Sequence, residues 1–279
     1  MQISLLQCQS SREVEANLAF IDSQLSQLPR KINEPQLVVL PECSLLFGGH
    51  EDQQLAVASS DEESELKQQL AALAKRYQVY MVAGTIPISA DAGRVYSRSY
   101  LFDDQGNTLG SYDKLHLFDV EVADDTKSYR ESDTFCPGDR ITVIDTPFGK
   151  IGLAICYDIR FADLFRALRL AGAELIALPS AFTKVTGEAH WQTLIQARAI
   201  ETQCYLLAAD QWGQHNHGGR ETWGQSMIVD PWGRIIAEKK SGLGWVQSRI
   251  DLGELAKIRQ QIPVVKHNRF ITPSLNSGS

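Results

Sequence analysis

The sequence lacks an apolar run of the roughly 20 residues that a membrane-spanning helix requires. Its first residues, MQISLLQCQS, include neither a basic leader nor a small-residue cleavage site, so we expect a cytoplasmic protein without a membrane partner. Lys and Arg number 27 against 34 Asp and Glu, and they are not clustered. The resulting net charge of −7 argues against a nucleic-acid partner, because binding a polyanion requires a concentrated basic surface.

Several motifs of known chemistry are also missing. The five cysteines form no CxxC pair and no Cys/His spacing typical of a zinc site, so we expect reduced thiols. No Walker loop, dinucleotide fingerprint or Gly-x-Ser-x-Gly elbow occurs. The stretch HNHGG, residues 215–219, has no thiol or carboxylate at ligand spacing, and it is better interpreted as a mobile lid. We therefore expect neither a metal nor a cofactor.

The remaining pattern predicts an α/β fold. Apolar stripes at helical spacing cover residues 14–28, 66–77 and 161–168. Between them lie continuous apolar runs, which are typical of strands covered on both faces. These runs are ISLLQCQ, QLVVLPE, VYMVAGTIPI, ITVIDTP, KIGLAIC, ELIALPSAF, CYLLAAD and SMIVDPWG.

The order of these elements suggests two similar halves. QLVVLPE is echoed by ELIALPS, and the hairpin YLFDDQGNTLGSY by MIVDPWGRIIAEK. A four-layer αββα sandwich would let each sheet bury one face on its partner and the other under helices. We predict a single domain over residues 1–270, followed by a flexible tail over 271–279.

The stretch GLAICYDIRF, residues 152–161, places a cysteine at the end of a predicted inner strand. Cys156 would then be followed by a sharp turn into a helix starting near Phe161, a layout similar to a nucleophile elbow. The helix N-terminus would favour the thiolate. An alternative of equal weight is that Cys156 is simply a small buried hydrophobe.

Two charged residues follow other predicted strands. Glu42 ends LVVLPE, where a carboxylate after apolar residues is costly unless it has a partner or a use, and Lys114 ends a hairpin strand in GSYDKLHLF. Taken separately, Glu42 is explained by a salt bridge and Lys114 by a solvated loop. Together with Cys156 they form a set suited to acyl transfer from an amide.

Each residue type of this set suits one step of that chemistry. Cys156 would attack the carbonyl carbon, and Glu42 would take the thiol proton and pass it to the leaving amine. Lys114 and the backbone N–H of Tyr157 would stabilise the oxyanion. We therefore predict a thiol-dependent enzyme with these residues at its centre.

The three motifs LVVLPE, YDKLHLFDVEV and GLAICYDIRF resemble those of the nitrilase superfamily of carbon-nitrogen hydrolases, in the same order, and the likeness extends over residues 1–270. The resemblance implies an αββα sandwich with a Glu-Lys-Cys triad, assembled as a homodimer or larger homo-oligomer. Glu131, in YRESDTFCPGD, matches a second glutamate that family members place near the triad. We assign it a positioning role, the alternative being a solvated loop acid.

The stretch SAFTKVTGEAHWQTLIQARAIETQCYLLAADQWGQHNHGG, followed by GQSMIVDPWG, is similar to the Nit branch. Within it, AIETQCYLLAADQWGQHN resembles deaminated glutathione amidases more than ω-amidases. This resemblance implies hydrolysis of deaminated glutathione to 2-oxoglutarate and cysteinylglycine, a metabolite repair reaction. The alternatives are an ω-amidase acting on α-ketoglutaramate, an N-carbamoyl hydrolase, and a catalytically silent scaffold with the same fold. Keeping all three triad residues argues against the scaffold.

Substrate-binding candidates follow the same strand ends. Arg160 could bind a substrate carboxylate, or instead form a salt bridge with Asp158 or Asp163. Further pocket candidates after LIALPSA are Phe182, Thr183, Lys184 and Thr186. Packing or interface roles are expected for His190 and Trp191, and a structural pair for Arg198 and Glu201.

Overall fold

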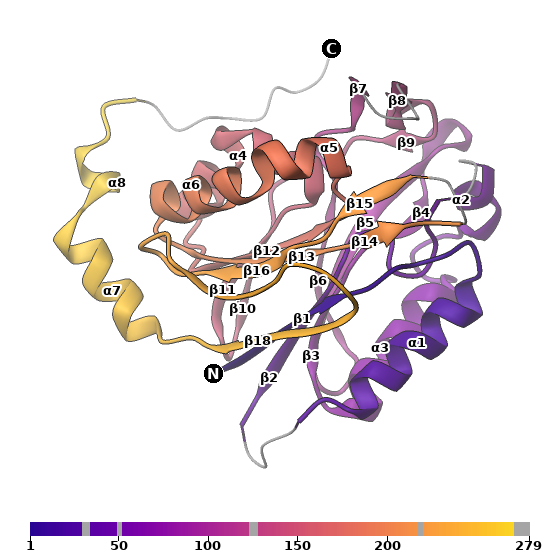
Figure 1. Ribbon diagram of the computed structural model, residues 1–279, viewed down its shortest axis with the longest axis horizontal. Helices are drawn as coiled ribbons and strands as arrows, with labels where there is room; N and C mark the ends of the chain where they lie inside the picture. The colour runs from indigo at the N-terminus through magenta and orange to yellow at the C-terminus, as the bar shows by residue number, and fades with distance from the viewer. Residues whose placement is uncertain (30–33, 49–51, 123–127, 217–219, 271–279) are drawn as a thin grey trace.

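The computed structural model describes residues 1–29, 34–48, 52–122, 128–216 and 220–270 (Figure 1). The predicted tail over 271–279 and the last three residues of HNHGG lie outside this part of the chain. Within the described ranges, no helix is both long and apolar enough to cross a membrane.

The first sheet contains β1 (Gln2–Gln7), β2 (Gln36–Leu40), β3 (Tyr80–Ala83), β4 (Ile86–Ser89), β5 (Val95–Phe102), β6 (Thr108–Asp113), β9 (Phe135–Cys136) and β18 (Gly244–Arg249). Its order is β18-β1-β2-β3-β5-β4, and β6 and β9 also pair with β5. The pairs β1–β2 and β2–β3 are parallel, so the chain leaves β1, β2 and β3 at the same edge of the sheet.

The second sheet contains β10 (Val143–Thr146), β11 (Gly149–Leu153), β12 (Leu175–Ser180), β13 (Tyr205–Asp210), β16 (Ser226–Val229) and β17 (Ile235–Lys239), paired in that order. Its pairs β11–β12 and β12–β13 are parallel. Two antiparallel ribbons complete the described strands: β7 (Asp119–Glu121) with β8 (Ser128–Arg130), and β14 (Trp212–Gln214) with β15 (Glu221–Trp223).

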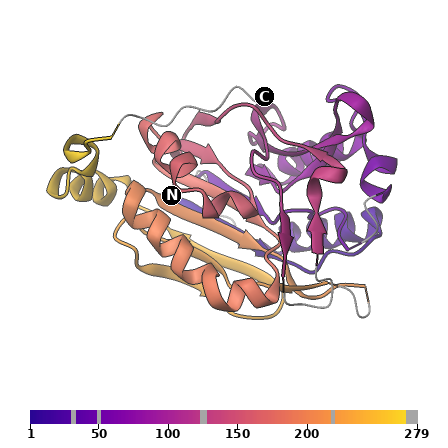
Figure 2. The ribbon, with the colours of Figure 1, turned by 90° about the horizontal axis from the view of Figure 1, so that it is seen from above.

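The helices cover the outer faces of the sheets. In Figure 1, α1 (Val14–Ser26) and α3 (Glu65–Tyr77) lie below the first sheet, and α4 (Ala162–Leu170) and α6 (Gln192–Thr202) lie above the second. Figure 2 shows α7 (Leu252–Gln261) and α8 (Val264–His267) projecting at one end. The remaining helical segments are short: α2 (Asp52–Val57), α5 (Lys184–Thr186), η1 (Asp91–Gly93), η2 (Glu131–Asp133), η3 (Cys156–Arg160) and the π-helical η4 (Gly187–Trp191).

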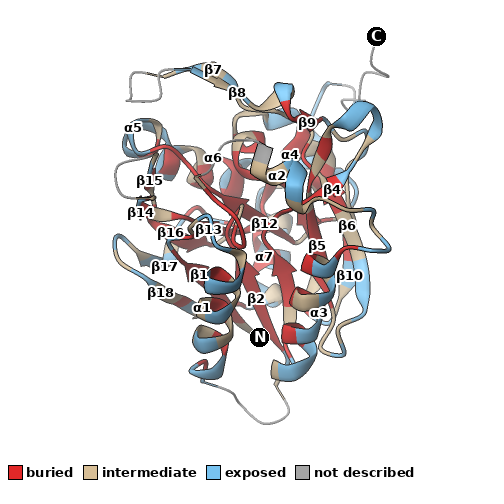
Figure 3. Ribbon diagram, turned by 90° about the vertical axis from the view of Figure 1, so that its right-hand side faces the viewer, coloured by how far each residue is buried: buried red, intermediate tan, exposed pale blue. Residues whose placement is uncertain are grey.

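The core explains why the strands are apolar without alternation. In β2, Leu37 and Val39 pack between the two sheets, while Val38 and Leu40 pack under α1 and α3. Side chains on both faces of the inner strands are therefore buried, as the colouring of Figure 3 shows. The predicted αββα sandwich is confirmed.

Two boundaries differ from the prediction, and both lie near the candidate site. The expected strand VYMVAGTIPI is divided into β3 and β4 at Gly84, which adopts φ +63°. A Cβ at Gly84 would lie 2.1 Å from the carbonyl oxygen of Pro41, so no larger residue fits there. The strand expected to end at Cys156 already ends at Leu153, and Cys156 opens η3 instead.

Candidate active site

A cavity of about 350 Å³ lies beyond the carboxyl ends of β2, β11 and β12. Glu42, Lys114 and Cys156 line it together, although they come from distant parts of the chain. Of the other predicted residues, Glu131, Tyr157, Phe182, Thr183 and Thr186 also line it. The two sheets thus direct their strand ends to one common site.

Cys156 sits on a strained elbow. After β11, Ala154 still donates its N–H to the carbonyl of Ala177 in the neighbouring strand, at 3.1 Å. Cys156 then adopts φ +44°, a left-handed conformation that is uncommon for a residue other than glycine. Such strain persists only where surrounding contacts hold it, and it is concentrated at functional sites.

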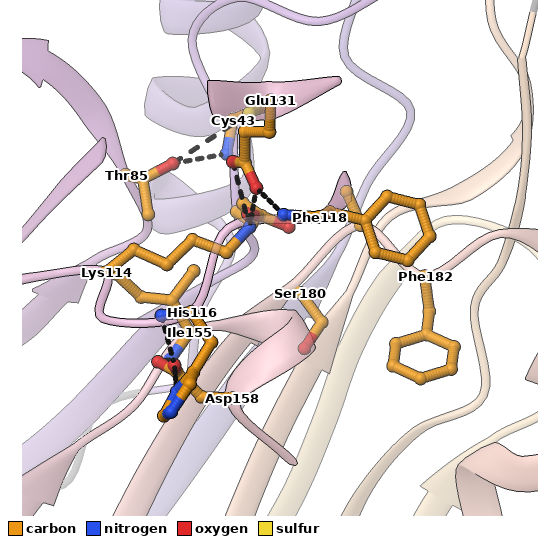
Figure 4. A network of polar contacts seen from close by, with 12 residues as sticks. Cys43, Thr85, Lys114, His116, Phe118, Glu131, Ile155, Asp158, Ser180 and Phe182 are labelled. Atoms are coloured by element: carbon orange, nitrogen blue, oxygen red, sulfur yellow. Dashed lines mark hydrogen bonds and ion pairs between the residues drawn. The ribbon is translucent and has the colours of Figure 1, made fainter. Parts of the chain in front are cut away.

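Asp158 supplies those contacts. Its Oδ2 accepts hydrogen bonds from the Ile155 N–H and the Tyr112 hydroxyl, both at 2.8 Å. Its Oδ1 accepts from the His116 backbone N–H at 3.1 Å and from the His116 ring at Nδ1, at 2.7 Å (Figure 4). This fully buried carboxylate therefore joins the Cys156 elbow to the segment that carries Lys114.

Lys114 is held between two carboxylates. Its Nζ lies 2.8 Å from Glu42 Oε1 and 2.9 Å from each oxygen of Glu131. Glu131 is fixed in turn by the Phe118 N–H, at 2.6 Å (Figure 4). Burial alone would lower the pKa of Lys114, but the charges of Glu131 and Glu42 outweigh it and raise that pKa well above its usual value. The ammonium therefore stays charged, as an oxyanion donor must.

The backbone around Glu42 is fixed from both sides. The Cys43 N–H donates to Thr85 Oγ1 at 2.9 Å, and Gln211 Nε2 donates to the Glu42 carbonyl at 3.0 Å. Cys43 also takes a left-handed conformation, with φ +56°. The Glu42 side chain is 5% exposed, so this carboxylate reaches the cavity with little freedom to move.

The thiol of Cys156 is protonated at neutral pH, contrary to the expectation that a helix N-terminus would favour the thiolate. Burial raises the pKa of Cys156 well above its usual value, and the nearby Glu42 charge raises it further. The five-residue turn η3 does not overcome these effects. Attack by Cys156 therefore requires a base at the moment of reaction, and Glu42 lines the same cavity.

Arg160 is not among the residues that line the cavity. Its guanidinium lies 3.4 Å from His190 Nδ1, and over the rings of Tyr157 and Phe182 at 5.9 and 5.3 Å. The alternative ion pair with Asp158 is not formed either, since both Asp158 oxygens bind other partners. The structure thus places Arg160 beside the pocket wall, against the Tyr157 and Phe182 rings.

The helical segments η4 and α6 support the site from outside the cavity. Arg198 pairs with Glu201 at 2.8 Å, as predicted, and its Nε donates to the Ile159 carbonyl at 2.9 Å. Trp191 is fully buried and donates its ring N–H to the Gln225 carbonyl at 2.9 Å, which confirms a packing role. The Arg198 contacts brace the segment that follows Cys156.

Sequence reasoning missed part of the cavity wall. The additional lining residues include Phe47, Phe118, Tyr129 and Arg220. These residues come from loops and short ribbons that have no hydrophobic periodicity. The sequence therefore did not predict that they line one cavity, and its only indication was an arginine after a glycine-rich stretch. In the described part of the chain, no group of three or more His, Cys, Asp or Glu residues could hold a metal ion.

Comparison with known proteins shows that the sequence is similar to amidases. The chain is 45% identical over 272 residues to the deaminated glutathione amidase of Yersinia enterocolitica, a match that covers 97% of this chain and 93% of the relative. It is 37% identical over 235 residues to the human omega-amidase NIT2, covering 84% of this chain and 83% of the relative.

The crystal structure of Saccharomyces cerevisiae Nit3, a member of branch 10 of the nitrilase superfamily, matches with a TM-score of 0.84 at 32% identity and covers 97% of both chains. The sequence model of the carbon-nitrogen hydrolase family matches residues 2–260, which include the whole sandwich and every predicted site residue. The chain therefore belongs to the carbon-nitrogen hydrolase family.

Proposed function

We propose that this protein is a thiol-dependent amidase that hydrolyses deaminated glutathione to 2-oxoglutarate and cysteinylglycine. The observation that carries the proposal is the convergence of Glu42, Lys114 and Cys156 on one cavity, each at most 6% exposed. The name of the Yersinia enterocolitica relative supports the choice of substrate.

In the acylation half of the reaction, Cys156 Sγ attacks the amide carbonyl carbon while Glu42 accepts the thiol proton. The carbonyl oxygen becomes an oxyanion that accepts hydrogen bonds from Lys114 Nζ and the Tyr157 backbone N–H. The C–N bond then breaks, and Glu42 passes its proton to the departing amine of cysteinylglycine. A thioester between Cys156 and the 2-oxoglutaryl group remains.

Deacylation uses the same residues in reverse. Glu42 takes a proton from a water molecule as the water oxygen attacks the thioester carbonyl. The C–S bond breaks, 2-oxoglutarate forms, and the proton on Glu42 returns to the thiolate. Glu131 acts here as a positioning residue, because it holds the Lys114 ammonium at 2.9 Å and leaves Glu42 as the base.

Two other functions are distinguishable from this one. The human omega-amidase NIT2 is 37% identical to this chain, which supports α-ketoglutaramate as an alternative substrate. A silent scaffold would have no reason to retain a buried, fully paired Lys114 beside a strained cysteine.

The test is release of 2-oxoglutarate from deaminated glutathione by the wild-type protein, with α-ketoglutaramate in parallel and Cys156→Ala as the control. Turnover of deaminated glutathione that disappears in Cys156→Ala is the expected result. Ammonia release from α-ketoglutaramate alone would assign the protein to the alternative. If the wild type turns over neither amide and mass spectrometry detects no thioester with either, the amidase proposal is wrong.

We also propose that the protein works as a cytoplasmic homo-oligomer. Support for assembly comes from Ile200 on α6 and the nearby Trp232, whose side chains are apolar and 53% and 47% exposed. The absence of disulfides among the five cysteines, all of which are described, supports a reducing compartment. A single species of about 31 kDa in light scattering would contradict the assembly.

A further inference from the structure

Arg220 lies on the wall of the catalytic cavity but has no part in the reaction described above. Its guanidinium carbon lies 5.1 Å from the ring centre of Phe47, 4.9 Å from that of Tyr129 and 6.0 Å from that of Phe118. Its carbonyl accepts the His215 N–H at 3.0 Å, which fixes the backbone at the start of β15. Arg220 is therefore held in a frame of aromatic rings from three other segments.

The hydrogen-bonding capacity of Arg220 is only partly used. Its Nη2 donates to the Ala181 carbonyl at 3.0 Å, whereas its Nε is buried and has no hydrogen-bond partner among the described residues. A buried donor without a partner is costly, and at the wall of a cavity a bound ligand can supply that partner. Ring faces do not satisfy the in-plane N–H groups, so the edge of the guanidinium remains available to a planar anion.

Two described acidic residues close to Arg220 are engaged elsewhere: Glu221 follows it in the chain, and Glu131 lines the same cavity. Glu221 pairs with Lys184 at 2.8 Å, and Glu131 pairs with Lys114 at 2.9 Å. Lys114 already lies between two carboxylates and is assigned to the oxyanion, so a substrate carboxylate requires another cation. The catalytic cluster would repel such a substrate unless another cation of the cavity compensates.

Ala181 links Arg220 to the nucleophile. Its carbonyl accepts from Arg220 Nη2, and its backbone N–H hydrogen-bonds the sulfur of Cys156. A single residue thus separates the guanidinium from the attacking atom. An anion bound by Arg220 would hold an amide only a few bonds away against Cys156.

We propose that Arg220 is a specificity-determining residue that binds a carboxylate of the substrate and selects anionic amides over neutral ones. This is the role that the sequence suggested for Arg160, which packs against the Phe182 ring and does not line the cavity. The proposal rests on the proposed amidase function, but it does not require deaminated glutathione to be the substrate.

The test compares two small amides of matched length, glutaramate with a terminal carboxylate and pentanamide with a terminal methyl group. Their kcat/KM values are measured by ammonia release for wild type, Arg220→Gln, Arg220→Lys and Arg234→Gln. Arg234 serves as the matched control because its side chain is a 69% exposed surface arginine.

Arg220→Gln should lower kcat/KM for glutaramate about 10- to 100-fold, mainly through KM, because a charge-assisted bond is lost. The kcat/KM for pentanamide should change less than about twofold. For glutaramate, the kcat/KM of Arg220→Lys should lie between those of wild type and Arg220→Gln, because lysine keeps the charge but lacks the paired N–H groups that bind both oxygens of a carboxylate. An equal loss on both amides would show a packing role and overturn the proposal, as would no loss on either.

If wild type hydrolyses neither small amide, the amidase function is judged by turnover of deaminated glutathione, and Arg220 is tested by binding alone. Isothermal titration of glutarate into wild type and Arg220→Gln should give a Kd about 10-fold or more weaker for the variant. Equal affinities would refute the role of Arg220 in carboxylate binding.

Discussion

Replacing Asp158 with Asn tests whether one buried carboxylate holds the catalytic elbow. Asn has almost the same shape as Asp, but its NH₂ group cannot accept hydrogen bonds. In either orientation it loses two of the four bonds that Asp158 accepts, either those from Ile155 and Tyr112 or both of those from His116. The NH₂ group of Asn would also face N–H or O–H groups that donate hydrogen bonds to Asp158.

The magnitude follows from this count. Hydrogen bonds to a charged group contribute about 1.5–3 kcal/mol each, so two of them give about 3–6 kcal/mol. Rotation of the Tyr112 hydroxyl recovers part of this, so we expect the free energy of unfolding to fall by about 3 kcal/mol. At roughly 2–4 °C per kcal/mol, Tm should fall by about 6–12 °C.

Activity should fall as well, because the same bonds tie Cys156 to the segment bearing Lys114. A small displacement between nucleophile and oxyanion donor costs about 10- to 100-fold in kcat. The assays are urea unfolding and ammonia release, with Asp163→Asn as the control, since Asp163 is an exposed aspartate in the first turn of α4. A change in unfolding free energy below about 0.5 kcal/mol for Asp158→Asn, or equal losses in the two variants, would refute the reasoning.

Two further predictions concern the backbone and the thiol. Gly84→Ala should destabilise the protein by about 3 kcal/mol in urea unfolding, because a Cβ meets the Pro41 carbonyl at 2.1 Å and φ is +63°. Gly93→Ala has φ +72° but open space around its Cβ, so it should cost only about 1 kcal/mol, and equal costs would contradict the steric argument. Because burial raises the pKa of Cys156, the protonated thiol dominates at neutral pH, and its alkylation by iodoacetamide should accelerate with rising pH without levelling off below pH of about 9. Peptide mass spectrometry of Cys156 measures this rate, and a plateau below pH of about 8 would show an activated thiolate instead.

The sandwich was predictable because its signal is local. Runs such as Leu37 to Leu40 have no polar member, and only a strand covered on both faces accepts that pattern. The presence of Glu42, Lys114 and Cys156 at one cavity was also predictable, since each comes shortly after a predicted strand, and Glu42 and Cys156 follow parallel strands, whose carboxyl ends lie at the same end of a sheet.

What the sequence did not reveal depends on contacts between remote segments. The sequence suggested Asp158 only as a partner for Arg160. In the structure, Asp158 instead binds Tyr112 in β6 of the first sheet and His116, which follows that strand. The protonated state of Cys156 arises from burial and from Glu42, and neither effect can be judged from a strand pattern. Arg220 is positioned by the rings of Phe47 and Tyr129, and no sequence pattern predicts that these residues lie beside it.

The pairing of β1 with β18 has a consequence for synthesis on the ribosome. Gln2 opposes Arg249 and Gln7 opposes Gly244, so β1 acquires its second partner strand only when almost the whole described chain has been made. Until then, β1 can pair with β2 but exposes its other row of N–H and C=O groups to any passing strand. The nascent protein therefore carries an unprotected edge for most of its translation. Chaperone demand and aggregation should peak just before the last strand emerges.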